Sequence, residues 1–145
     1  MTARQGPPAR RFEWPVRVYW EDTDAGGIVF YANYLKFLER ARTEWLRSLG
    51  IEQRRLREET GGMFVVTETA LKYLRPARLD DRLTITAVLS QIGQVAMTLH
   101  QQALLNSEHN SPPVVLCEGS IRIAWVDAAT LRPARLPITV LEKFG

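Results

Sequence analysis

The stretch that decides the fold is NYLKFLERARTEWLRSLG, residues 33–50. Its apolar side chains recur at steps of four, three, four and four residues, which marks one face of an α-helix: Tyr34, Leu38, Ala41, Trp45 and Leu49. Three more apolar side chains widen this stripe, namely Leu35, Phe37 and Leu46. Asn33 is a suitable N-cap and Gly50 a suitable stop signal. We therefore expect one long helix that the rest of the chain largely encloses.

The segments on either side of this helix read mainly as strands. Residues 15–20 are β-branched and aromatic, whereas residues 52–60 are too polar for a core and should form a short solvated helix or a loop. Four strand-like runs follow, rich in Val and Thr or alternating with period two: 64–74, 83–89, 95–105 and 114–126. The order of one strand, one long helix and four strands predicts an α+β domain with an antiparallel sheet around a single helix.

Charge and cysteine content exclude several classes of protein. The chain of 145 residues has a formal charge of +3, from 19 basic and 16 acidic residues. Arg4, Arg10 and Arg11 fall in the first eleven residues, which contain no acid, so the charge total does not support a nucleic-acid-binding face. Cys117 is the single cysteine, which excludes an intramolecular disulfide framework. We predict a flexible basic tail over residues 1–13 and one domain over 14–145.

The N-terminal segment and the hydropathy of the chain bear on its location. No apolar run approaches the roughly 20 residues of a membrane-spanning helix. The first residues carry prolines and arginines without an apolar core, unlike a secretory signal peptide. We therefore expect a cytoplasmic protein without membrane insertion.

The densest chemical signal is EDTDAGGIVFYANY, residues 21–34. Its three acids sit at the end of a predicted strand, and its two glycines lead toward a helix start. A carboxylate beside helix N-terminal amides can attack a carbonyl or activate a water while the amides polarise the carbonyl oxygen. An ordinary turn would use the same residue types. A calcium loop counted from Asp22 is excluded, because its fifth position is Gly26 and its twelfth is Asn33.

Two segments carry a family resemblance. Residues 21–44, EDTDAGGIVFYANYLKFLERARTE, and residues 73–81, YLRPARLDD, resemble the signature of the 4-hydroxybenzoyl-CoA thioesterase family of hotdog-fold proteins. The tol-pal-associated branch is the most similar. The resemblance implies a hotdog fold, hydrolysis of an acyl-CoA to a free acid and CoA, and no metal or other cofactor. It also implies a homodimer or homotetramer with the active site at the subunit interface.

The resemblance also assigns roles to residues. Asp24 would be the catalytic carboxylate, as nucleophile or as general base, and the backbone N–H of Tyr31 would bind the oxyanion. Substrate-binding residues would be Gly27, Ile28, Val29, Phe30, Asn33 and Tyr34. Contacts to the CoA phosphates would come from Arg75, Arg78 or Arg82, for which solvated turn charges are the other reading. Tyr31 and Tyr34 would line the acyl pocket, and core packing is an equal reading for both.

The chain departs from its branch in two places and leaves rival functions open. Relatives often carry His at position 31 and Tyr at position 20, where this chain has Tyr31 and Trp20. A non-catalytic acyl-binding or scaffold hotdog protein is the main alternative. A hydratase is disfavoured, because His100 and His109 are poorly placed for an acid–base pair.

Overall fold

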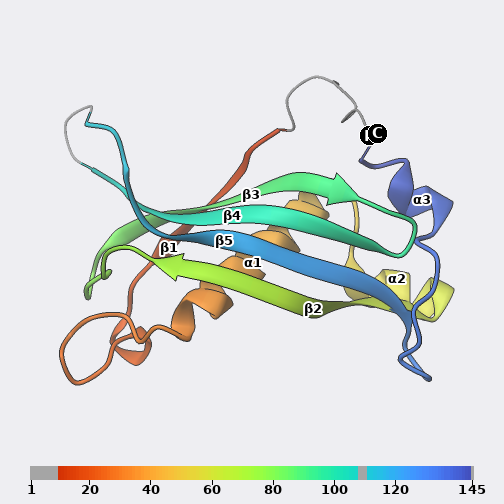
Figure 1. Cartoon of the computed structure of the whole chain (residues 1–145), viewed down its shortest axis with the longest axis horizontal. Coiled ribbons are helices and arrows are strands. Elements are labelled where there is room, and N and C mark those ends of the chain that lie inside the picture. Colours follow the sequence, from red (N-terminus) through yellow and green to blue (C-terminus); the bar gives the residue numbers. More distant parts are fainter. Residues whose placement is uncertain (1–9, 108–110, 145) are drawn as a thin grey trace.

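The computed structural model describes residues 10–107 and 111–144. Five strands form one sheet in the order β1-β3-β4-β5-β2, and every neighbouring pair is antiparallel. The strands are β1 (Phe12–Arg17), β2 (Gly62–Tyr73), β3 (Arg82–Ile92), β4 (Ala96–Leu105) and β5 (Val114–Asp127). The long helix α1 (Asn33–Ser48) lies across one face of this sheet (Figure 1). The predicted α+β architecture is confirmed.

The helical face that packs on the sheet is close to the predicted one. Phe37 and Leu38 are fully buried, and they belong to the same core cluster as Leu83 of β3 and Leu99 of β4. Leu35 is exposed instead, because it lies to one side of the stripe that faces the sheet. Its place in the predicted stripe was therefore wrong.

The two ends of α1 differ in how well they were predicted. Gly50 follows the C-cap Leu49 with a φ of 81°, which confirms it as the stop signal. The predicted N-cap is wrong, since Ala32 occupies that position without a capping side chain. The Asn33 side-chain amide instead donates a hydrogen bond to the Asp22 carbonyl at 2.8 Å. It ties the helix start to the preceding loop.

The first strand begins and ends earlier than predicted. β1 starts at Phe12 and pairs with β3 as far as Arg17, so residues 12 and 13 belong to the sheet and not to the tail. Trp20 lies beyond this strand, in the 3-10 turn η1 (Trp20–Asp22). Pro15 suggested a strand start, but an edge strand such as β1 tolerates a proline inside it. Residues 1–9 of the predicted tail lie outside the described residues.

Two short helices complete the fold at the end of the sheet away from η1 (Figure 1). They are α2 (Gln53–Thr60) and α3 (Ile138–Leu141). Of the two forms predicted for residues 52–60, α2 is the short solvated helix. Phe144 follows α3 and stacks on Trp45 of α1 with ring centroids 5.3 Å apart. This end of the molecule is therefore closed by contacts on the C-terminal half of α1.

Candidate functional site

The loop between β1 and α1 is organised around Asp22. One carboxylate oxygen of Asp22 accepts a hydrogen bond from the Tyr19 amide at 2.9 Å. Its backbone carbonyl accepts from the Phe30 amide at 3.1 Å and from the Asn33 side chain at 2.8 Å. Asp22 is buried, as a structural residue should be. These contacts fold the loop back onto the start of α1.

Asp24 lies at the exposed tip of this loop. Its Oδ1 accepts a hydrogen bond from the Gly26 amide at 2.8 Å, and its own amide donates to the Ile28 carbonyl at 2.8 Å. Gly27 has a φ of 79°, a conformation that glycine adopts without strain. The carboxylate is thus held in position by one oxygen, while the other oxygen has no hydrogen-bond donor among the described residues.

A second segment, residues 74–81, is joined to the Asp24 loop. The Val29 amide donates to the Ala77 carbonyl at 2.9 Å, and Ile28 pairs with Arg78 in an antiparallel bridge. The Ala77 amide donates to the Tyr34 hydroxyl at 3.0 Å. Burial is the largest cause that raises the pKa of this tyrosine. The structure therefore brings together both segments of the resemblance and gives Tyr34 an anchoring contact.

Backbone donors are available where α1 begins. The Tyr31 amide has no hydrogen-bond acceptor within residues 10–107 and 111–144, and the N-cap Ala32 provides no capping side chain. The N-terminus of a 16-residue helix such as α1 carries a partial positive charge. This end of α1 therefore offers an amide to a developing negative charge.

Aromatic rings surround this helix start. Tyr31 packs against Phe30 with ring centroids 4.8 Å apart and lies edge-on to Tyr73 at 6.0 Å. Tyr73 in turn lies 5.7 Å from Tyr34. Tyr73 had no role assigned from the sequence, although it begins the second segment of the resemblance. Its position at the end of β2 is what places it here, and periodicity alone does not reveal that.

Two of the three candidate phosphate contacts, Arg75 and Arg78, are exposed beside this loop. The Arg75 amide donates to the Leu116 carbonyl at 3.1 Å, and the Arg78 amide donates to Oδ2 of Asp81 at 2.8 Å. Neither guanidinium has a carboxylate within 4.0 Å in the described part of the chain. Arg78 lies directly next to Ile28, whereas Arg75 lies where the chain leaves β2.

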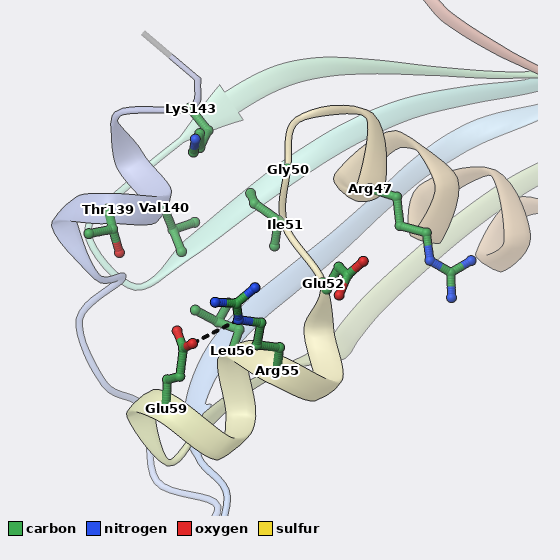
Figure 2. A pocket seen from close by; sticks show the side chains of 10 residues that line it. All are labelled: Arg47, Gly50, Ile51, Glu52, Arg55, Leu56, Glu59, Thr139, Val140 and Lys143. Carbon is green, nitrogen blue, oxygen red and sulfur yellow. Dashed lines mark hydrogen bonds and ion pairs between the residues drawn. The ribbon is translucent and has the colours of Figure 1, made fainter.

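A separate cavity of about 360 Å³ lies at the other end of the molecule (Figures 1 and 2). Figure 2 shows Arg47 and Gly50 from the end of α1 and the Arg55–Glu59 ion pair of α2 around it. None of the residues predicted for the site lines it. Within the described ranges, no three His, Cys, Asp or Glu side chains are grouped to hold a metal ion. No described helix is both long and apolar enough to cross a membrane.

The fold and the loop define the class of protein, and comparisons with known proteins agree. A single helix against a five-stranded antiparallel sheet is the hotdog architecture that the sequence resembles. A family model described as the thioesterase-like superfamily matches residues 18–144. The chain belongs to this superfamily.

Individual relatives are similar over almost the whole chain. The acyl-CoA thioesterase YbgC of Haemophilus influenzae is 39% identical over 133 residues, which cover 92% of this chain and 93% of that protein. A probable thioesterase from Bartonella henselae has a TM-score of 0.78 and 32% identity over 88% of this chain and 100% of its own. The 4-hydroxybenzoyl CoA thioesterase of a Pseudomonas species has a TM-score of 0.83 at 20% identity, over 93% of this chain and 99% of its own. This last likeness confirms the predicted fold.

Proposed function

We propose that this protein is an acyl-CoA thioesterase that hydrolyses the thioester bond to a free acid and CoA. The observation that carries the proposal is the loop between β1 and α1: it holds the Asp24 carboxylate by one oxygen and leads into the start of α1, where the Tyr31 amide lacks an acceptor among the described residues. The names of its relatives support the same chemistry. A binding or scaffold protein has no need for a positioned carboxylate beside an amide donor.

Asp24 can act in this reaction by either of two mechanisms. As nucleophile, a carboxylate oxygen forms a bond to the thioester carbon, the C–S bond breaks, and CoA leaves as a thiolate that is then protonated. Water next hydrolyses the resulting anhydride and regenerates the carboxylate. As general base, Asp24 takes a proton from a water whose oxygen attacks the same carbon, and it returns that proton to the departing sulfur.

Both routes place a negative charge on the thioester oxygen, which is where the Tyr31 amide acts. A hydrogen bond to an oxyanion is stronger than one to a ground-state carbonyl, so this donor lowers the barrier more than it tightens substrate binding. Loss of one such donor typically costs about 10²–10³ in kcat. The side chain at position 31 has no part in this step, which is consistent with Tyr31 standing where relatives often carry His.

The edge of the sheet favours a homodimer with the site at the subunit interface. β2 is the edge strand beyond β5, twelve residues long, and residues 66–70 of it are exposed. A long edge strand presents unpaired backbone groups to another strand. Exposed apolar surface is added by Val66 on this strand and, near the Asp24 loop, by Tyr31, Leu35 and Tyr73. Acyl-CoA esters are intracellular metabolites, so the proposed activity fits a cytoplasmic location.

Free-thiol release from a panel of aromatic and short- to long-chain acyl-CoAs tests the activity. We expect turnover of at least one substrate by the wild type and a loss of most of it in Asp24→Asn. Glu58→Gln is the matched control, because it removes one exposed carboxylate from α2 at the far end of the molecule. Near wild-type turnover in Asp24→Asn would remove Asp24 from the mechanism. No turnover across the panel, with acyl-CoA binding retained, would favour the binding-protein alternative.

A further inference from the structure

An open groove of about 720 Å³ lies on the β1 side of the Asp24 loop, and the reaction steps above make no use of it. Trp20 and Tyr19 belong to it and are unusually exposed for aromatic residues, with 76% and 60% of their surface accessible. Large exposed aromatic side chains gathered in a depression indicate a binding surface. The full lining is Arg17, Tyr19, Trp20, Glu21, Leu79 and Asp80.

Arg17, which lines this groove, is paired with a second arginine, Arg82, which is not itself part of the lining. Arg17 ends β1 and is directly opposite Arg82, the first residue of β3. Directly opposite residues of an antiparallel pair have Cβ atoms about 4.5–5.5 Å apart, and like charges there destabilise the pair. Neither guanidinium has a carboxylate within 4.0 Å in residues 10–107 or 111–144. A bound phosphate would relieve this repulsion and accept hydrogen bonds from both side chains.

The groove is held in shape by backbone contacts to the turn before β3. The Asp80 amide donates to the Val18 carbonyl at 3.0 Å, and the Val18 amide donates to the Asp81 carbonyl at 3.0 Å. The carboxylates of Glu21 and Asp80 line the same groove. They are unfavourable for a phosphate, but they are acceptors for an exocyclic amine of a nucleobase. The groove thus offers an aromatic surface, amine acceptors and one lining cation, Arg17, with Arg82 paired next to it.

We propose that this groove binds the adenosine–phosphate end of CoA, with the adenine stacked on Trp20 and a phosphate between Arg17 and Arg82. The assignment rests on the proposed function, because it takes acyl-CoA as the substrate. Trp20 and Asp24 are four residues apart, so their Cα atoms are at most about 15 Å from each other. The extended pantetheine arm spans such a distance, and the substrate then runs along η1 with its thioester at Asp24.

Calorimetric titration with CoA, adenosine 3′,5′-bisphosphate and pantetheine tests the groove directly. Stacking of one base on an aromatic side chain is worth a factor of about 5 to 150 in affinity. We expect Trp20→Leu to raise the Kd for CoA and for the bisphosphate about tenfold or more, and Trp20→Phe to retain most of the affinity. The charge reversal Arg17→Glu with Arg82→Glu should weaken the same two ligands at least tenfold. Pantetheine binding should respond to neither change.

Arg54→Glu is the matched charge-reversal control, because Arg54 is highly exposed on α2 at the other end of the molecule (Figure 1). A second readout compares kcat/KM for an acyl-CoA with that for the same acyl group on N-acetylcysteamine, which lacks the nucleotide. The preference for the CoA ester should fall about tenfold in Trp20→Leu and in the double arginine variant.

The outcomes separate this proposal from the proposed function. Unchanged CoA affinity in both Trp20→Leu and the double arginine variant overturns the groove assignment, and it then favours Arg75 and Arg78 as the phosphate ligands. If these variants lose affinity for the bisphosphate but keep their affinity for CoA, the assignment is also overturned, since the groove would then bind free nucleotides only. If no thioester is hydrolysed while CoA binding depends on Trp20 as expected, the groove assignment is supported and the proposed thioesterase function is refuted.

Discussion

Removal of one buried hydroxyl should loosen the connection between α1 and residues 74–81, the segment that is hydrogen-bonded to the Asp24 loop. The Tyr34 hydroxyl accepts a hydrogen bond from the Ala77 amide at 3.0 Å, and Tyr34 is only 3% exposed. Tyr34→Phe leaves this amide buried without an acceptor, which costs about 1–3 kcal/mol of the free energy of unfolding. For a domain of this size, Tm should fall by roughly 2–4 °C for each kcal/mol lost.

Urea unfolding followed by tryptophan fluorescence measures this loss. Tyr73→Phe is the control, because Tyr73 is 46% exposed and its hydroxyl has no hydrogen bond among the described residues. That variant should stay within about 0.5 kcal/mol of the wild type. Both variants are compared at one protein concentration, since the stability of a dimer depends on it. Equal stability of Tyr34→Phe and Tyr73→Phe would refute the anchoring role of the Tyr34 hydroxyl.

Three further changes have expected outcomes that urea unfolding also measures. Gly119→Ala should lower the free energy of unfolding by at least about 1–3 kcal/mol, because a Cβ there would lie 1.9 Å from the Ala70 carbonyl oxygen and force β2 and β5 apart. An unchanged free energy of unfolding would mean that the two strands separate at no cost. Gln101→Leu should lower the free energy of unfolding by about 1.5–3 kcal/mol, since it removes the oxygen of buried Gln101 that accepts a hydrogen bond from Arg42 at 3.0 Å. Stability equal to that of the wild type would show that Arg42 finds another partner. Burial raises the pKa of the Cys117 thiol from 9.0 to about 11, so the folded protein keeps a proton that the unfolded chain releases, and the free energy of unfolding should fall as pH rises from 9 to 11. Cys117→Ala should flatten that slope, and an unchanged slope would assign it to other groups.

The sequence was sufficient for the elements whose signal is periodic. The helical stripe predicted α1 to within one residue at its C-terminal end. Runs that are rich in Val and Thr or that alternate located the strands β2 to β5. The predicted bounds of β1 were wrong because its sequence signal is short and contains a proline. Pairing with β3, rather than local propensity, sets the ends of this strand. Leu35 was misassigned because an apolar residue at the margin of a helical face can point toward solvent or toward another subunit.

The site was less predictable than the fold because its contacts cross the chain. Asp24 and Tyr31 lie in one motif, so the resemblance could assign a predicted role to both. The contacts of Ala77 with Val29 and Tyr34 join segments more than forty residues apart, and no spacing rule reports them. Asn33 shows the same limit, since its residue type favours an N-cap, whereas the nearby Asp22 carbonyl provides a better partner in the folded loop.

Local charge, rather than total charge, explains how a nearly neutral domain can take a polyanionic substrate. On α1 and α2, arginines pair with glutamates three or four residues away, as with Arg47 and Glu44. Around the Asp24 loop the strands and turns provide no such spacing, and Arg17 and Arg82 are instead brought together by sheet pairing. These two guanidiniums are left without a carboxylate within 4.0 Å among the described residues, although Glu21 and Asp80 lie along the same groove. Because these charges are exposed, their attraction for a phosphate is screened within about 8–10 Å at physiological salt. They can therefore orient a CoA that already touches the groove, while its capture depends on stacking and on the pocket for the acyl group.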